Sequence, residues 1–419
     1  MSTKRIAVCL RVVIVQLNPQ IGQVQQTLSR TWEILDKFKE QLDSEPHTKF
    51  PDLVVFPEFA LTGYNFKSKD HIQPFLSSSP TEGPSFDLAS KVSEMFNCYT
   101  VIGYPERHID KLNNESLYNS AVVVNPKGEM VFNYRKSFLY YTDEDWGCEE
   151  NPKGFQTFSL AFPGRGKDVK TGTTVDVLLK SSIGICMDLS PYKFEAPFHD
   201  YEFATYNLDN SSELIICPMA WLHASSYSKN SNKTEAETIT DIKCNLARQH
   251  LFEIGSQGNY KFNFDQFKST EKISRESKNI VTEYTNLEEP DMYNINYWIL
   301  RFLPFLSLES RKNWFHDNIL FSFLKGKSNS RKSYIGCTLS KPWEFEGNNS
   351  ILILANRCGV EDTNTVFAGS SGIYKFNGQN SDIGSKMDST NRSVELLGNL
   401  GKCYEGIIMR DVEFEVKRK

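Results

Sequence analysis

The sequence predicts an α/β layered fold, because strand-like and helix-like segments alternate through its first hundred residues. Apolar, β-branched runs at 11–17, 52–56 and 99–104 have the composition of buried strands. Between them, apolar residues recur at steps of three and four over 24–42 and again over 86–96, as on one face of an amphipathic helix. A strand–helix–strand–helix–strand order is typical of helices packed on a sheet.

A hairpin is expected after these segments, because 117–124 and 129–134 flank the turn sequence NPKG. The later apolar runs predict further strands at 175–186, 213–217, 350–356, 365–368 and 394–397, and a helix near 235–253. The predicted sheet is therefore large and mixed.

The composition is that of a packed globular protein, since 39% of the 419 residues are hydrophobic and 13% are aromatic. With 47 basic and 52 acidic residues the net charge is −5, which implies neither a nucleic-acid nor a membrane partner. Nine cysteines without a C-x-x-C pair predict mostly reduced, buried thiols. Residues 1–11 lack a signal-peptide core, so we expect a cytoplasmic or nuclear protein, with a mitochondrial form from an upstream start left open.

Residues 259–334 do not follow the strand and helix pattern. They are rich in Lys, Ser and Asn at both ends and contain a dense aromatic block at 297–308. The block is shorter than the roughly 20 apolar residues that a membrane span needs. Two interpretations stay open: an insertion that packs its aromatic side chains on the main core, or a substrate lip or partner-docking patch.

Several common chemistries lack their motifs. The seven histidines show no metal-ligand spacing, and the dinucleotide, P-loop and serine-hydrolase motifs are absent from the sequence. Cys186 is the candidate nucleophile, because it ends an apolar strand where the following backbone N–H groups can face an oxyanion. An inert core thiol is the commoner state of such a cysteine.

Two charged residues favour the catalytic interpretation of Cys186. Glu58 directly follows the predicted strand 52–56, and Lys136 follows the second strand of the hairpin. Each alone is more typical of a solvated loop charge. Together they give the order Glu, Lys, Cys, each at the end of a strand.

This order and its surroundings resemble the nitrilase superfamily of carbon–nitrogen hydrolases, whose catalytic residues are a Glu, a Lys and a Cys. The matching segments are PEFALTGY (57–64), YRKSFLY (134–140), GICMD (184–188), LIICPMAW (214–221), NRCGVED (356–362) and FAGSSGIYKFNG (367–378). More narrowly, LNPQIGQV (17–24), GICMDLSPYKF (184–194), EEPDM (288–292) and LLGNLGK (396–402) are similar to members that act on protein N-termini. The spread of these segments implies one domain over 8–419, interrupted at 259–334.

The resemblance implies a four-layer α-β-β-α sandwich and an amidohydrolase without cofactor or metal. Its substrates would be proteins and peptides with a free N-terminal Asn or Gln, deamidated to Asp or Glu with release of ammonia. The products would feed arginyl-transferase and the ubiquitin ligase of the N-degron pathway. The alternatives are a small-molecule ω-amidase or nitrilase-type enzyme, and a catalytically silent scaffold on the same fold.

The resemblance also implies roles for the three residues. Cys186 would attack the amide carbon as a thiolate, and Glu58 would take up and return the proton. Lys136 and the backbone N–H of Met187 would stabilise the oxyanion, and the ammonium group should also favour the thiolate.

Two further site residues are expected. A second carboxylate should orient Lys136 from the run TDEDWGCEENPKG (142–154), where Glu144, Glu149 and Glu150 compete and Glu149 is favoured. Asp188 either binds the α-ammonium of the substrate or caps the turn at 189–193.

Overall fold

The computed structural model describes residues 4–44, 50–223, 259–261, 289–306, 345, 347–361, 365–378 and 393–418. The helix predicted near 235–253 lies outside these residues. Within the described part of the chain, no helix has the length and apolar character to cross a membrane.

A sheet of 13 strands runs through the molecule in the order β14-β13-β10-β8-β7-β6-β1-β2-β3-β4-β5, with β15 paired to β1 and β9 paired to β15. The strands are β1 (Lys4–Gln16), β2 (Leu53–Val55), β3 (Tyr99–Ile109), β4 (Glu115–Val124), β5 (Met130–Arg135), β6 (Thr157–Asp168), β7 (Thr174–Ile183), β8 (Leu214–Met219), β9 (Asn259–Lys261), β10 (Asn349–Asn356), β13 (Gly372–Asn377), β14 (Val394–Asn399) and β15 (Gly406–Arg418). Two short strands, β11 (Val360–Glu361) and β12 (Thr365–Val366), pair separately.

Strand β1 divides the sheet into two halves. Its first part pairs with β6 and its last part with β2, while β15 runs antiparallel along its whole length. Because successive side chains of a strand point to opposite faces, Val12 and Ile14 enter one hydrophobic core and Val13 and Val15 enter another. The two halves therefore pack face to face, with one hydrophobic core between them. The other core lies on the outer face of the half that contains β1 to β4.

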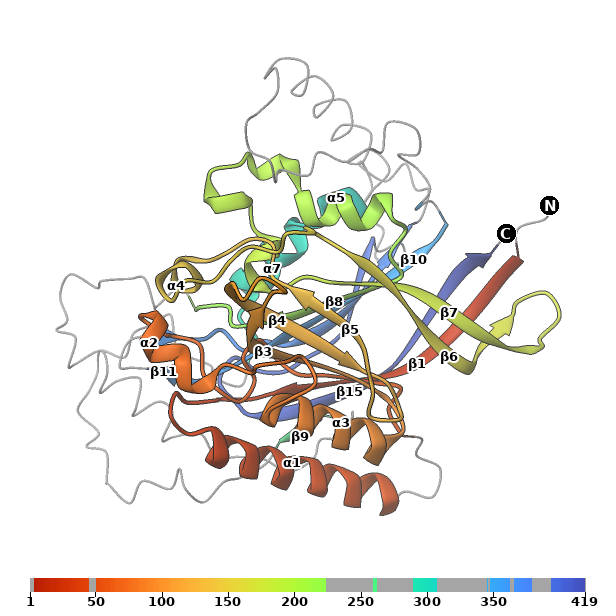
Figure 1. The fold of residues 1–419 in the computed structure, drawn as a ribbon. Coiled ribbons are helices and arrows are strands. Elements are labelled where there is room, and N and C mark those ends of the chain that lie inside the picture. Colours follow the sequence, from red (N-terminus) through yellow and green to blue (C-terminus); the bar gives the residue numbers. More distant parts are fainter. Residues whose placement is uncertain are drawn as a thin grey trace, which may run out of the picture.

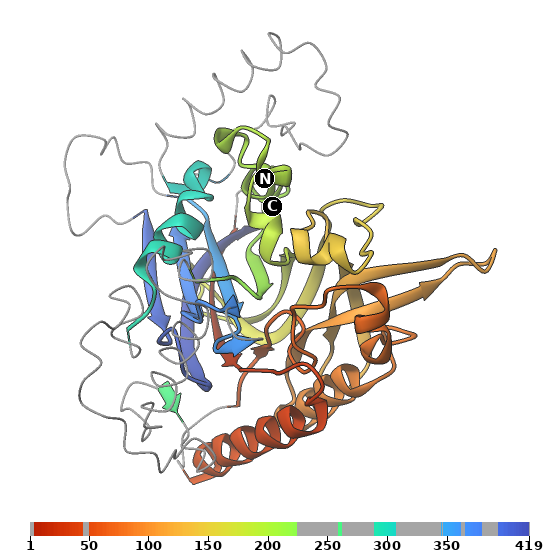
Figure 2. The ribbon, with the colours of Figure 1, turned by 90° about the vertical axis from the view of Figure 1, so that its left-hand side faces the viewer.

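Helices cover both outer faces (Figures 1 and 2). The helices α1 (Val24–Ser44) and α3 (Pro84–Phe96) lie below the half that contains β1 to β4. On the opposite side lie α5 (Glu202–Asp209), α7 (Met292–Leu300) and α8 (Leu303–Leu306). The predicted α-β-β-α sandwich is confirmed by this arrangement. The shorter elements are α2 (Lys69–Ile72), α4 (Tyr141–Asp145), η1 (Gln73–Phe75), η2 (Cys186–Leu189), η3 (Tyr192–Phe194) and η4 (Phe198–Asp200).

The strands and helices predicted up to residue 134 are confirmed, with β1 starting earlier than expected. The strand predicted over 175–186 ends at Ile183, so that Cys186 lies in the turn η2 instead. Part of the predicted insertion is described as α7 and α8, and Trp298, Phe302 and Phe305 from it are buried in the main core. This packing agrees with the first of the two interpretations of that region.

Candidate active site

Glu58 lies just beyond β2, in a loop held closely against β3. Its side chain is fully buried, and the next residue, Phe59, has a left-handed backbone with φ of 47°. A Cβ atom on Gly103 of β3 would come within 2.6 Å of the Glu58 Cα, so only glycine allows this approach. The close contact places Glu58 at the carboxyl end of the sheet with its carboxylate turned inward.

Lys136 follows β5 and lies between two carboxylates. Its Nζ atom is 2.8 Å from Oε1 of Glu58 and 2.7 Å from Oδ2 of Asp143, and all three side chains are fully buried. Asn119 of β4 donates to the same two groups, at 2.6 Å to Glu58 and 2.9 Å to Asp143. A buried ammonium ion needs such partners, since desolvation of an unpaired charge is costly.

Cys186 opens the turn η2 with a left-handed backbone, φ 44°. The backbone N–H of Ala220, after β8, donates to Oε2 of Glu58 at 2.6 Å and also acts to lower the pKa of the Cys186 thiol. Left-handed non-glycine residues cost free energy and are concentrated at functional sites. The structure thus brings the three predicted residues, Glu58, Lys136 and Cys186, into one site.

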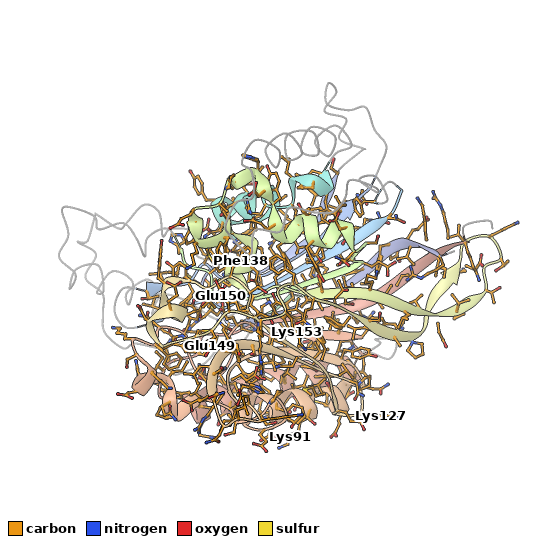
Figure 3. The ribbon with its side chains drawn as sticks, turned by 45° about the horizontal axis from the view of Figure 1, so that its top comes forward. Lys91, Lys127, Phe138, Glu149, Glu150 and Lys153 are labelled. Atoms are coloured by element: carbon orange, nitrogen blue, oxygen red, sulfur yellow. The ribbon has the colours of Figure 1, made fainter. Side chains whose placement is uncertain are left out.

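The carboxylate beside Lys136 is Asp143 rather than Glu149, which corrects the choice made from the sequence. Glu149 and Glu144 are exposed, and Glu150 accepts a hydrogen bond from the Tyr192 hydroxyl. Glu149 and Glu150 are labelled in Figure 3. Asp143 reaches Lys136 because α4 turns it inward, where it also accepts the backbone N–H of Tyr140 at 3.0 Å. Asp143 belongs to the same acidic run, for which the resemblance implies a glutamate in this role.

Asp188 is held by hydrogen-bond donors of the protein itself, and its expected role in binding the substrate ammonium stays a prediction. It is fully buried and lies outside the set of described residues that line the active-site cavity. It accepts the backbone N–H groups of Ile185, Ser137 and Phe138, at 2.7, 3.1 and 2.7 Å, and the Tyr134 hydroxyl at 2.9 Å. The expected cap of the turn at 189–193 is not formed by these bonds: Asp188 instead closes the start of the Cys186 turn through the Ile185 N–H and joins that turn to the Lys136 loop.

Burial governs the protonation of the site. It raises the pKa of Glu58, although Lys136 opposes the shift. Burial lowers the pKa of Lys136, but Asp143 and Glu58 outweigh it and keep this pKa well above its ordinary value. Burial and the Glu58 carboxylate raise the pKa of the Cys186 thiol well above its usual range, against the effect of Lys136. Lys136 therefore favours the thiolate as expected, yet the free thiol keeps its proton.

A cavity of about 250 Å³ opens over Cys186. The described residues that line it are Tyr64, Tyr140, Tyr141, Cys186, Met187, Ser190, Phe194, Ala220, Trp221 and Leu222. This volume is below the roughly 300–1,000 Å³ of sites for larger ligands, so the cavity fits one small side chain. Phe194 and Tyr141 are 48% and 60% exposed, which places them at the cavity mouth. The described residues contain no cluster of side chains suited to a metal ion.

The fold and the buried Glu, Lys and Cys define a carbon–nitrogen hydrolase, and the chain belongs to this family, within the nitrilase superfamily. The family model for carbon–nitrogen hydrolases matches residues 11–190. Over 459 aligned residues the chain is 48% identical to the protein N-terminal amidase of Saccharomyces cerevisiae. The alignment covers 100% of this chain and 98% of the yeast protein.

Other relatives agree with this assignment. The protein N-terminal amidase of Schizosaccharomyces pombe is 38% identical over 55% of this chain and 74% of its own. Crystal structures of N-terminal amidase with an Asn-Glu-Ala peptide and with a Gln-Gly peptide are 45% identical, with TM-scores of 0.79 and 0.80. Each covers 99% of this chain and 100% of the crystallised one. A further structure of the same kind carries a Cys-to-Ser substitution.

Proposed function

We propose that this protein removes the side-chain amide of N-terminal Asn and Gln residues, giving Asp and Glu with release of ammonia. The observation that carries the proposal is the burial of Glu58, Lys136 and Cys186 beside a cavity with room for one small side chain. The peptides in the relatives' structures begin with Asn or Gln. Aromatic rings around the cavity also suit a substrate that carries a positive charge, because ring faces attract cations.

The first half of the reaction forms a thioester. Cys186 Sγ attacks the amide carbon while the Glu58 carboxylate takes the thiol proton, since the free thiol is protonated. Lys136 and the backbone N–H of Met187 donate to the amide oxygen, on which negative charge develops. Glu58 then gives its proton to the amide nitrogen, the C–N bond breaks, and ammonia leaves.

The second half hydrolyses the thioester. A water molecule enters the position of the departed ammonia and attacks the carbonyl carbon, while Glu58 takes a proton from it. The C–S bond breaks as Cys186 recovers the proton from Glu58. Asp143 and Asn119 act by positioning: they keep Lys136 charged and Glu58 oriented throughout both halves.

The cellular role follows from the products. An N-terminal Asp or Glu is the acceptor for arginyl-transferase, so this enzyme would act before arginylation and the N-degron ubiquitin ligase. Such a place in the pathway agrees with the cytoplasmic location expected from the sequence.

Peptides with and without a free α-amine test the proposal. An Asn-first and a Gln-first peptide should each release ammonia and gain the mass difference between an amide and an acid. The same peptides acetylated at the α-amine should be inert. Mass spectrometry with an ammonia assay measures both; equal turnover of acetylated peptides would instead indicate a small-molecule ω-amidase.

The matched control is Cys186→Ala, which keeps the cavity but removes the nucleophile. Turnover of the free peptides should fall below detection. Activity near that of the native protein would exclude Cys186 from the mechanism. The preference for peptides with a free N-terminal Asn or Gln would then be the only part of the proposal that still stands.

A further inference from the structure

One wall of the cavity is formed by Trp221 and Leu222, which follow β8. The main chain of Trp221 is fixed by Asn356 at the end of β10: the Trp221 N–H donates to Asn356 Oδ1 at 2.8 Å, and Asn356 Nδ2 donates to the Trp221 carbonyl at 3.3 Å. These bonds fix the backbone and leave the orientation of the indole to other contacts.

The indole is oriented by helix α7. Its Nε1–H donates to Asn294 Oδ1 at 3.1 Å, while Asn294 Nδ2 donates to the Leu222 carbonyl at 3.3 Å. One amide side chain therefore contacts both residues of the wall. Since an indole has a single N–H donor, this bond selects one ring orientation. The Tyr297 ring lies 5.5 Å from the indole, and its hydroxyl donates to Ser190, another cavity residue, at 3.4 Å.

Helix α7 is itself firmly attached to the core. Ile295 and Trp298 are buried, and the Trp298 ring meets the Trp221 indole edge-on at 5.9 Å. Directly after the helix, the buried Arg301 donates through Nε to the carbonyl of Leu189 at 2.6 Å. Leu189 ends the turn that Cys186 begins. The helix and the residue directly after it thus contact both the cavity wall and the nucleophile turn.

We propose that Asn294 is a positioning residue for substrate selection, which sets the length of the cavity through the indole of Trp221. This inference rests on the proposed function. The Asn and Gln side chains differ in length by one methylene group. To accept both, the wall must lie at a distance from Cys186 that leaves room for either side chain. Both α7 and Trp221 lie outside the residues 11–190 that match the family model, so the nucleophile segment and this wall come from different parts of the chain.

The variant Asn294→Leu tests the proposal, because leucine has a similar volume and makes none of the side-chain hydrogen bonds of Asn294, which include one that it donates to Asp291 Oδ2 at 2.8 Å. We expect KM for both peptides to rise about three- to tenfold, the effect of losing hydrogen bonds of ordinary strength, with kcat changing less. The ratio of kcat/KM for Gln-first over Asn-first peptides should change about threefold or more. The reason is that a wall whose indole is no longer held in one orientation contacts the longer Gln and the shorter Asn side chain differently. The matched control is Tyr293→Ala on the same helix, whose side chain is 88% exposed and which should leave these constants unchanged.

A double-mutant cycle separates positioning from loss of fold. In a Trp221→Phe background there is no indole N–H to orient, so Asn294→Leu should change the Gln/Asn ratio much less than it does in the native background. Equal changes in both backgrounds would overturn the proposal. An unchanged ratio and KM in Asn294→Leu itself would also overturn it.

A reagent independent of peptide turnover distinguishes failure of this proposal from failure of the proposed function. Iodoacetamide carries a small carboxamide, and its rate of alkylating Cys186 can be followed by mass spectrometry. Asn294→Leu should change this rate, and Tyr293→Ala should not. If the native protein turned over neither peptide, the proposed function would fail, while the alkylation rates would still decide whether Asn294 positions the wall.

Discussion

The Lys136 ammonium lies 2.7 Å from the Asp143 carboxylate, and both side chains are closed off from solvent. Asp143 is the largest influence that raises the pKa of Lys136 against the effect of burial. With Glu58 on its other side, Lys136 is part of a buried chain of charges that ends at the cavity. Asp143 therefore controls the charge of Lys136 without contacting the substrate.

Replacing Asp143 by Asn should weaken catalysis and change its pH dependence. The loss of one carboxylate lowers the pKa of Lys136, so the activity that needs a charged Lys136 should disappear at a lower pH on the alkaline side. We expect kcat to fall about 10²-fold, the effect of displacing a catalytic group by about 1 Å. Kinetics of Asp143→Asn across the alkaline range measure both effects.

The control for this prediction is Glu149→Gln. Glu149 is the carboxylate that the sequence favours, but its side chain is exposed, so kcat and the alkaline limb should match those of the native protein. A large loss in Glu149→Gln with little change in Asp143→Asn would restore the sequence-based choice.

The acid side of the pH profile should depend on Asp188 as well as on Glu58. Activity requires an ionised Glu58, whose pKa burial raises. Burial also raises the pKa of Asp188 to about 7. A protonated Asp188 cannot accept all four of the hydrogen bonds that its carboxylate accepts. The hydrogen bonds that join the Cys186 turn to the Lys136 loop should therefore weaken as the pH falls through this value. We expect kcat/KM to decline on the acid side from about pH 7.

Tyr134→Phe tests the part of this decline that belongs to Asp188. The Tyr134 hydroxyl donates to Asp188 and lowers its pKa, so its removal should raise that pKa and move the acid limb to higher pH. Phenylalanine keeps the ring, and the proton-accepting Glu58 is untouched. An acid limb that stayed in place or moved to lower pH would show that Asp188 does not govern it.

The limits of the sequence-based prediction have physical causes. Glu58, Lys136 and Cys186 could be found because each lies at or just after the end of an apolar run in the sequence and their order matches a family. Asn119 could not, since it lies inside the apolar strand β4, where sequence does not show which polar group meets a buried charge. The strands predicted from the sequence follow continuous apolar runs, and β15 is not among them, although its alternating apolar and charged residues are the pattern of a half-buried strand. Its pairing with β1, at the other end of the chain, is not visible in the sequence.

Gly103→Ala should impair catalysis without removing any functional group. A Cβ at this position would lie 2.6 Å from Glu58 Cα and 2.7 Å from the Pro57 carbonyl oxygen, so the Glu58 loop must move away from β3. We expect the crowding to cost about 1–3 kcal/mol of unfolding free energy. The shift of Glu58 should lower kcat per folded molecule by about 10²-fold if it approaches 1 Å.

Gly398→Ala in β14 is the matched comparison for this last prediction. Its Cβ would meet the flexible Arg410 side chain at 2.7 Å, away from the site, so it should cost stability while kcat per folded molecule stays at the native value. Denaturant unfolding and active-site titration with iodoacetamide give the stability and the folded fraction of both variants. Native kcat in Gly103→Ala would mean that the approach of β3 does not position Glu58, and the left-handed Phe59 next to it would then be the remaining backbone feature able to do so.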